Sequence, residues 1–406
     1  MLNGLLHTRL SELLALLLVS CRVLLMGWLV SCRVLLMGWL VSCRVLLMGW
    51  LVSCRVLLMG WLVSCRVLLM GWLVSCALLL VGCGAAPMEF ISLSGEMLGT
   101  QYNITAELPR GSGRFVTAEA ERLDERMKRE MSIFDPSSQL SKINRGETNE
   151  LTPWIEQNIR LADSISRLSG GLYDITCAPL VRAWGFAGGK PRFDIEPNID
   201  SLLQFVGYKT IAVSGGELQR QDPRTQIDLN SIAKGFAVDR LAEILVRAGA
   251  QNLMVDIGGE LVTKGTNPKG GGWRIGIETP IDGNMTNGEL LQRRIVIDPD
   301  SKLRAVATSG NYRRFHTGAN GEKVVHTINP LTGRAESSGL LSVTVMARTC
   351  AEADAMATML LAAGDRRAEA IADGLENCEV YLIYNSEAAG LYRIYCSQGM
   401  RRLLLD

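Results

Sequence analysis

An eleven-residue unit, CRVLLMGWLVS, is repeated five times without a substitution between Cys21 and Ser75. An identical tandem repeat of this kind is typical of a recent duplication and not of a folded domain. An apolar run of about 20 residues can span a bilayer, but every unit contains an Arg and no polar turn separates the units, which argues against a stack of spans. We therefore predict that residues 1–82 are a leader and that the folded part of the chain lies beyond them.

The end of the leader carries a signal of its own. Leu80-Val81-Gly82-Cys83 closes a short apolar run and resembles the lipobox of bacterial lipoprotein signals, in which a lipidated Cys becomes the N-terminus. Small and turn-prone residues follow and suit a tether over residues 83–90. We expect a body that is lipid-anchored to a membrane of the bacterial cell envelope and faces the periplasm or the cell exterior. The LVSC of each repeat is also similar to a lipobox, so the choice of the processed Cys stays open.

The charge of the remaining chain argues against one class of partner. Residues 1–82 carry six Arg and one Glu, so the net charge of +1 over the whole chain leaves −4 for the rest. A nucleic-acid-binding protein would show a basic stripe with interleaved aromatic residues, and the sequence offers none. The four Cys beyond the leader form no CxxC pair, so they support neither a zinc cage nor a thioredoxin-like motif, and most are expected to be small buried hydrophobes.

Helical and strand-like patterns mix from about residue 88 without a regular β-α-β rhythm, which predicts an α+β fold for residues 91–406, as one large domain or two fused lobes. Helices are expected at 119–131, 153–169 and 232–248. Loops rich in Gly, Pro and charge are expected at 188–197 and 266–272. Strands are expected at 209–213, 252–257, 273–278, 294–297, 342–346 and 380–384.

One helical stretch, AEADAMATMLL at residues 351–361, is apolar after Glu352 except at Asp354 and Thr358. The four-residue spacing places this carboxylate and this hydroxyl on one face of the helix, one turn apart. Thr349 and Glu352 predict a capping box at the helix start. This face either binds a group that is coordinated by oxygen atoms, or its two polar side chains are simply exposed to water. We expect the pair in an exposed cleft, so that the loss of Asp354 costs within about 1 kcal/mol of stability.

Four further segments have the composition of ligand contacts. SGGLYDIT at 169–176 places two Gly before an apolar-aromatic pair and a carboxylate, which suits close approach of backbone to a planar ligand. IDLNSIAKGF at 227–236 ends a strand with an Asp and enters a helix with a Lys in its opening turn, where anions bind. VDIGGE at 255–260 ends a strand in a Gly pair, and HTINPLTGR at 326–334 places a His before a Pro-containing turn. Each alone is compatible with an ordinary turn, cap or surface residue, and only their combination indicates a site.

Together with MLGT at 97–100, MSIFD at 131–135 and ATSG at 307–310, these segments resemble, in this order, the bacterial FAD:protein FMN transferases of the ApbE family. The resemblance covers essentially all of residues 88–406. It implies a T-fold-like α+β body with mixed or antiparallel sheets and packed helices, usually an exported lipoprotein. Such a body binds FAD and Mg²⁺ and transfers FMN to a Thr or Ser hydroxyl of an acceptor flavoprotein, such as a subunit of a membrane redox complex, with release of AMP.

The same resemblance implies the residues of the site. Asp354 and Thr358 fall at the positions of Mg²⁺ ligands, and the backbone carbonyl of Ser231 completes them. His326 is the candidate general base, although a purely positional role fits about as well, and Asp228 would help to lower the barrier. The positions that contact FAD are Leu98, Phe134, Leu172, Tyr173, Asp174, Asp228, Lys234 and Ile328.

Three positions depart from the pattern of the family, since Leu98, Phe134 and Asn329 stand where Met, Tyr and Asp are usual. A hydroxyl contact to the flavin is therefore in doubt, whereas stacking would survive. Two other functions use the same residues. A Mg²⁺-dependent FAD pyrophosphatase would let water attack and give FMN and AMP, and a non-catalytic FAD-binding lipoprotein would ignore the metal. The sequence alone does not separate these functions.

Overall fold

The computed structural model describes residues 21–37, a few residues between 61 and 72, and the ranges 86–186, 198–281, 291–312, 315–317, 323–335, 338–386 and 392–405. The chain divides into two units, Met1–Met88 and Glu89–Asp406. In the first unit residues 21–37 are helical, and the rings of Trp28 and Trp61 stack with their centroids 6.1 Å apart. Within the described ranges, no helix combines the length and the apolar character that a membrane span needs. Cys83 lies outside the described residues, so its role as the anchor stays a prediction, whereas residues 88–90 of the predicted tether belong to the first strand of the body.

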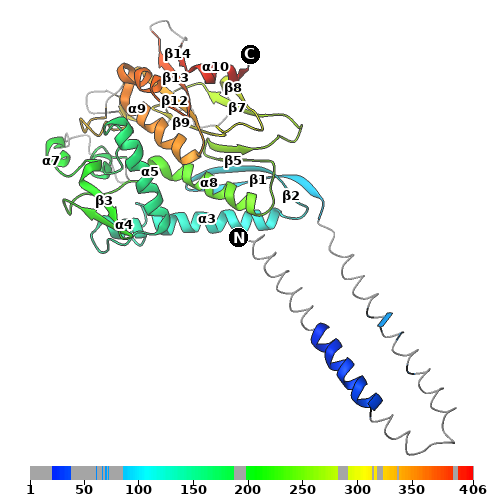
Figure 1. Ribbon diagram of the computed structural model, residues 1–406. Coiled ribbons are helices and arrows are strands. Elements are labelled where there is room, and N and C mark those ends of the chain that lie inside the picture. The colour runs from blue at the N-terminus through cyan, green and yellow to red at the C-terminus, as the bar shows by residue number, and fades with distance from the viewer. Residues whose placement is uncertain are drawn as a thin grey trace, which may run out of the picture. The chain divides into compact units, whose positions relative to one another are not determined.

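The second unit is built on an eight-stranded sheet (Figure 1). From β2 to β14 every neighbouring pair of strands in it is antiparallel. In β12, for example, Thr344 lies opposite Thr308 on one side and Tyr381 on the other. In spatial order the strands are β1 (Met88–Met97), β2 (Thr100–Pro109), β5 (Leu253–Ile257), β6 (Glu260–Lys264), β9 (Ala305–Gly310), β12 (Leu340–Ala347), β13 (Glu379–Asn385) and β14 (Tyr392–Cys396).

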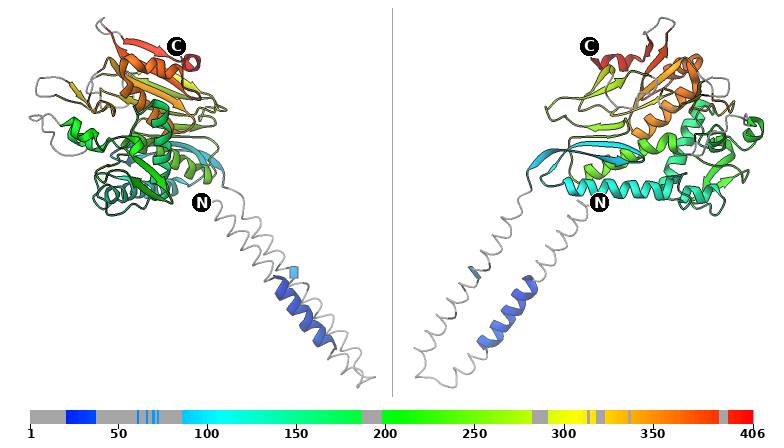
Figure 2. Two further views of the ribbon diagram at one scale, coloured as in Figure 1. Left: turned by 60° about the vertical axis from the view of Figure 1, so that its left-hand side comes forward. Right: turned by 180° about the vertical axis from the view of Figure 1, so that it is seen from behind.

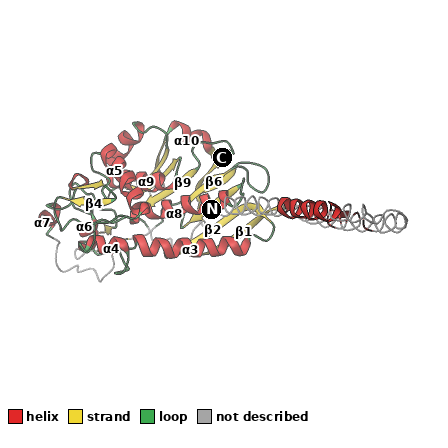
Figure 3. Ribbon diagram, turned by 60° about the horizontal axis from the view of Figure 1, so that its bottom comes forward, coloured by secondary structure: helices red, strands yellow, loops and turns green. Residues whose placement is uncertain are grey.

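Two long helices lie directly on one face of this sheet. These are α8 (Asn230–Arg247), which packs on β5 and β6, and α9 (Cys350–Asp373), which packs on β9 and β12. Two more, α3 (Gly113–Met131) and α5 (Pro153–Ser169), pack against them, and Figure 3 shows this helical layer in red over the yellow strands. Buried aliphatic side chains from both layers form the main core. The helix α9 is broken at Gly364, where φ is 69° and ψ is −173°.

A small three-stranded sheet covers the opposite face of the large sheet, and the resulting layers can be followed in Figure 2. Its Trp273 and Ile295 pack against Val306, Met346 and Ile383 of the large sheet. Because β12 is covered on both faces, nearly all of its side chains are buried, which explains the almost continuous apolar run LLSVTVMA. The strands of the small sheet, in spatial order, are β15 (Leu404–Leu405), β8 (Leu291–Ile297) and β7 (Trp273–Glu278).

The remaining elements are short and lie in the connections between the long ones. Two strand pairs form separate hairpins, β3 (Ile211–Ser214) with β4 (Glu217–Arg220) and β10 (Phe315–Thr317) with β11 (Lys323–Val325). The short helices are α4 (Gln139–Asn144), α6 (Ala178–Ala183), the 3₁₀ turn η1 (Tyr208–Thr210), α7 (Ile199–Leu203) and α10 (Gln398–Leu403).

The α+β prediction is confirmed, and α5 has both of its predicted ends. Thr152 accepts the N–H of Ile155 at the start of this helix, and Gly170 ends it in the left-handed conformation with φ of 62°. The loop at 266–272 is confirmed, whereas the loop predicted at 188–197 lies outside the described residues. Among the described Cys none forms a disulfide, and three of the four in the body are buried, as expected.

Several predicted boundaries differ from those of the structure. The helix predicted from residue 119 begins at Gly113, because the apolar residues before the charged stretch, such as Val116, already pack into the core. The strand predicted from residue 209 begins at Ile211, after the 3₁₀ turn. The predicted strand that ends at Asp228 is only an isolated bridge at Gln226, and α8 begins at Asn230, so Lys234 lies in its second turn rather than in its first.

Candidate active site

The predicted site residues on α8 and α9 meet where these two helices pack most closely. Gly235 makes this approach possible, because a Cβ there would overlap the carbonyl oxygen of Cys350. At the same contact the N–H of Gly235 donates a hydrogen bond to Oδ2 of Asp354 at 3.1 Å. The carboxylate of Asp354 is therefore held against the backbone of the neighbouring helix.

Asp354 is buried, with 4% of its surface exposed. The expectation that it lies in an exposed cleft is wrong, because the close packing of α8 on α9 excludes solvent from this side chain. The pKa of Asp354 is raised to about 7, first by burial and then by the nearby carboxylate of Glu260, while Lys234 and the Gly235 N–H act in the opposite direction. A carboxylate in this position becomes ionised near neutral pH only at a cost, which a bound cation would offset.

Lys234 and Glu260 form an ion pair beside Asp354. Glu260 is 3% exposed, and its Oε2 has no hydrogen-bond partner in the described part of the chain. Burial lowers the pKa of Lys234, but the charges of Glu260 and Asp354 outweigh that effect and hold it above its ordinary value. The ammonium therefore stays protonated and is half-buried beside two carboxylates.

Ser231 and Thr358 extend this cluster by one helical turn on each side. Ser231 lies in the first turn of α8, and its Oγ is 3.0 Å from the hydroxyl of Tyr173. Its backbone carbonyl has two lone pairs, so it can accept the helical N–H and still offer one lone pair to a ligand. Thr358 follows Asp354 by one turn, with its Oγ1 3.3 Å from Oγ of Ser309.

These donors fit a hard divalent cation. The predicted ligands Ser231, Asp354 and Thr358 offer oxygen atoms only, and the orphaned Oε2 of Glu260 adds another buried oxygen nearby. Within the described ranges no group of three or more His, Cys, Asp and Glu side chains gathers as a metal cage. A cation held here would therefore complete its shell with water or with phosphate oxygens, as Mg²⁺ usually does.

The predicted flavin contacts at 172–174 and at Asp228 are buried beside this cluster. Tyr173 touches Ser231, and burial raises the pKa of its hydroxyl above the ordinary value. Asp174 accepts hydrogen bonds from the N–H and Oγ1 of Thr176 and from the N–H of Tyr208, so its carboxylate fixes the local loop. Leu172 and Asp228 are also buried, and burial raises the pKa of the Asp228 carboxyl, which accepts the N–H of Asn230.

The other predicted flavin contacts lie on separate loops. Leu98 sits in the tight turn between β1 and β2 with φ of 51°, a conformation that costs a Leu about 1 kcal/mol, and the carboxylate of Asp124 accepts its N–H at 2.9 Å. Strained backbone of this kind is concentrated at functional sites. Phe134 is 61% exposed, so its ring is available to a ligand.

His326 follows β11 and packs edge-on against Phe186, with 6.3 Å between the ring centroids. Ile328 is buried in a small apolar cluster with Leu180 and Ile199. The structure thus brings together Tyr173, Ser231, Lys234, Asp354 and Thr358, and it carries Leu98, Phe134, His326 and Ile328 on surrounding loops.

Glu260 and Ser309 are the residues of this cluster that the sequence prediction did not select. Both lie in motifs that were recognised, VDIGGE and ATSG. Glu260 could have been selected from the sequence, because it is a charged residue that directly follows a Gly pair and begins an apolar strand. In the structure the next three side chains of this strand are buried. A charge at the head of a buried strand needs a partner, and Lys234 is that partner.

Comparison with known proteins identifies the family. The model of the ApbE family matches residues 98–382. The chain belongs to the ApbE family. An FAD:protein FMN transferase of Vibrio cholerae is 36% identical over 297 residues, covering 71% of this chain and 85% of the relative. An FAD:protein FMN transferase of Haemophilus influenzae is 33% identical over 315 residues, covering 73% of this chain and 87% of that relative.

The fold agrees with that of solved ApbE proteins. The flavin transferase ApbE from Vibrio cholerae superposes with a TM-score of 0.66 at 31% identity and covers 78% of this chain and 100% of its own. The ApbE protein of Thermotoga maritima has a TM-score of 0.66 at 24% identity and supports the fold alone. The ApbE fold inferred from the sequence is therefore confirmed, with helices packed on antiparallel sheets.

Proposed function

We propose that this chain transfers the FMN moiety of FAD to a Thr or Ser hydroxyl of an acceptor flavoprotein, with Mg²⁺ as cofactor and AMP as the second product. As a member of the ApbE family, 36% identical to a relative named FAD:protein FMN transferase, the chain is an enzyme of the flavin transferase class. The observation that carries the finer proposal is the buried cluster of Lys234, Glu260 and Asp354, which places one ammonium and two carboxylates at the contact of α8 with α9.

The reaction exchanges the phosphoanhydride bond of FAD for a phosphoester bond to the acceptor. The acceptor Oγ forms a bond to the phosphorus of the FMN half of FAD, the bond from that phosphorus to the bridging oxygen breaks, and AMP leaves with that oxygen. The hydroxyl proton must go to a base or to solvent. Charge neutralisation and in-line alignment supply most of the catalysis in phosphoryl transfer of this type.

The residues of the cluster divide these tasks. Asp354 and Thr358, with the carbonyl of Ser231, would hold Mg²⁺, whose charge would stabilise the pyrophosphate oxygens when it is bound. Lys234, kept protonated by its pairing with Glu260, attracts the anionic substrate. His326 is the candidate that accepts the acceptor hydroxyl proton, since an imidazole titrates near neutral pH.

The leader also suggests where in the cell the enzyme is located. We propose that Cys83 is lipidated and that the body is held at a membrane of the cell envelope, where subunits of membrane redox complexes would serve as acceptors. The lipobox-like run Leu80-Val81-Gly82-Cys83 supports this proposal. Two acyl chains give stable attachment, whereas one is marginal.

Intact-mass measurement tests the proposed function. The full chain is incubated with FAD, Mg²⁺ and an acceptor domain that contains a flavinylation Thr, and a parallel reaction uses the same acceptor with Thr→Val. We expect the acceptor to gain the mass of FMN less water, and AMP to appear in equal amount. Release of free FMN and AMP without acceptor labelling would show a pyrophosphatase instead. The absence of any Mg²⁺-dependent product would refute both enzymatic functions.

A further inference from the structure

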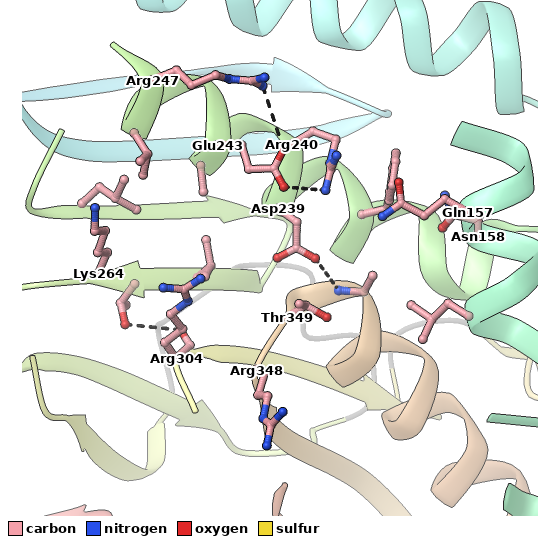
Figure 4. Close-up of a pocket in the computed structure, with 18 residues that line it drawn as sticks. Gln157, Asn158, Asp239, Arg240, Glu243, Arg247, Lys264, Arg304, Arg348 and Thr349 are labelled. Carbon is pink, nitrogen blue, oxygen red and sulfur yellow. Dashed lines mark hydrogen bonds and ion pairs between the residues drawn. The ribbon is translucent and has the colours of Figure 1, made fainter. Parts of the chain in front are cut away.

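A cavity of about 490 Å³ is lined by residues other than those of the cluster of Asp354 (Figure 4). None of the predicted flavin or metal residues lines it. Its walls come from α5, from the second half of α8, from β5 and β6, and from the residues that precede β9 and open α9. The volume falls within the range of small-molecule sites, which is roughly 300–1,000 Å³.

The lining of this cavity is strongly basic. It contains five basic side chains and two acidic ones, all of which are labelled in Figure 4. Glu243 pairs with Arg240 at 2.6 Å and more loosely with Arg247 at 3.9 Å. The two oxygens of Asp239 accept the N–H groups that open α9, at 2.9 and 3.0 Å, so they are already used. The basic side chains that remain are Lys264, Arg304 and Arg348.

These three cations have no carboxylate partner in the part of the chain that the structure describes. Arg348 donates to the neutral amide oxygen of Asn377 at 2.7 Å, and Lys264 and Arg304 make no side-chain hydrogen bond or ion pair there. Arg304 is held in place through its backbone, which bonds to Thr263 and Ala347 on the neighbouring strands. Cations gathered on a hollow without counter-charges create a positive potential that attracts an anion of more than one charge.

The rest of the lining suits an organic molecule rather than a bare ion. Phe236, Leu253 and Val262 form an apolar floor. Asn158, which is 1% exposed, donates through Nδ2 to the carbonyl of Trp154 at 2.9 Å, and its Oδ1 has no hydrogen-bond partner among the described residues. A buried amide oxygen without a donor costs free energy, which a ligand N–H or O–H would recover. In Figure 4 Asn158 lies across the cavity from Lys264 and Arg304.

We propose that this cavity is a second ligand site, which binds a phosphate monoester or diester through Lys264, Arg304 and Arg348. The apolar part of the ligand lies on the floor of Phe236, Leu253 and Val262, and a hydrogen-bond donor reaches Oδ1 of Asn158. The same phosphate chemistry is offered by a soluble nucleotide and by the headgroup of an anionic lipid. This inference does not depend on the proposed transfer reaction, because the cavity shares no residue with the candidate active site.

Calorimetry with AMP, adenosine and inorganic phosphate tests the soluble form of the ligand. The full chain is kept in metal-free buffer with saturating FAD, so that the flavin site is filled. We expect AMP to bind and adenosine not to bind. The double variant Lys264→Gln/Arg304→Gln is expected to bind AMP about 100-fold more weakly, because it loses two charge-assisted hydrogen bonds worth about tenfold each. Lys269→Gln, in the loop between β6 and β7 and outside the cavity, is the matched control.

Cosedimentation with vesicles tests the membrane form. Wild type and the double variant share the same leader, so a difference between them on phosphatidylglycerol vesicles, and none on phosphatidylcholine vesicles, reports the cavity alone. Weaker binding of the double variant in either assay, at an unchanged melting temperature, supports the site. Equal binding of wild type, double variant and control in both assays, or no binding in either, would overturn it.

Discussion

Replacing Asp354 by Asn is expected to stabilise the metal-free protein above neutral pH while removing its response to Mg²⁺. Asp354 is buried, and its carboxyl has a pKa of about 7 instead of 3.8, first because of desolvation and then because of Glu260. Above pH 7 the native state therefore contains a buried, ionised carboxylate. Asn has nearly the same shape, and its amide oxygen can still accept the N–H of Gly235.

The expected gain follows from the displaced pKa. The difference between about 7 and 3.8 corresponds to at most about 4 kcal/mol of native-state destabilisation at pH 8, at 1.36 kcal/mol for each pKa unit. Water entry and local relaxation reduce this figure, so we expect Asp354→Asn to raise the free energy of unfolding by ~1–3 kcal/mol. In the wild type, Mg²⁺ at 100 times its dissociation constant would add about 2.7 kcal/mol, and the variant would gain nothing.

Urea unfolding at pH 8 in EDTA and in excess Mg²⁺ measures both effects. Asp365→Asn is the matched control, because this residue lies on α9, is exposed, and accepts a backbone N–H from Gly339 that an amide oxygen can also accept. The control is expected to keep wild-type stability and the full response to Mg²⁺. If Asp354→Asn destabilises the metal-free protein, or if Mg²⁺ stabilises the variant as much as it stabilises wild type, then Asp354 is not a cation ligand whose buried charge destabilises the metal-free protein.

Four further predictions concern single side chains. His326→Ala should slow FMN transfer by ~10²–10⁴-fold with FAD affinity nearly unchanged and should remove the acidic limb of the pH–rate profile; an intact limb would exclude it as the base. Glu260→Gln should free the Lys234 ammonium from its carboxylate partner and so lower KM for the anionic FAD more than it changes kcat, and steady-state kinetics showing an unchanged KM would contradict this. Burial raises the pKa of Asp239 from 3.8 to about 6, so its contribution to stability is complete below about pH 4 and is lost as the pH rises through about 6. In Asp239→Asn the free energy of unfolding in urea should therefore depend less on pH between pH 4 and pH 6, and an unchanged slope would count against this assignment. Cys83→Ala should move the protein from the membrane fraction to the soluble fraction on ultracentrifugation, and retention with membranes would argue against this anchor.

Local patterns predicted the elements whose ends carry side-chain signals. Thr152 and Gly170 define α5, and Thr349 with Glu352 forms the capping box of α9 that the sequence indicated. The first turns of α3 were missed because Gly113 and its neighbours carry no such signal and are helical through tertiary packing. The layering of a second sheet on the back of β12 was likewise invisible, since an apolar run reads the same whether one or both of its faces are covered.

The sequence predicted which motifs form the candidate site, but it did not predict the burial or the charged partners of their side chains. The spacing of Asp354 and Thr358 indicated one helical face, and the structure confirms the helix. Sequence could not show that Gly235 lets α8 approach closely enough to bury that carboxylate, because this contact joins residues more than a hundred positions apart. The partner of Lys234 was not found either, although Glu260 stood in a recognised motif, because their pairing depends on how α8 packs on β6.

The break at Gly364 divides α9 into two parts that make different contacts. The part before it carries Asp354 and Thr358 and packs against both α8 and the large sheet. The part after it is tied to the edge strand β14 through Glu369 with Arg393 and through Asp373 with the Tyr395 hydroxyl. The final turns can thus open together with β14 as one local unfolding unit, without disturbing the ligand-bearing turns. Amide protons of residues 365–373 should exchange with deuterium well before those of residues 350–361, and this corner of the body is where inserted or fused segments would be tolerated best.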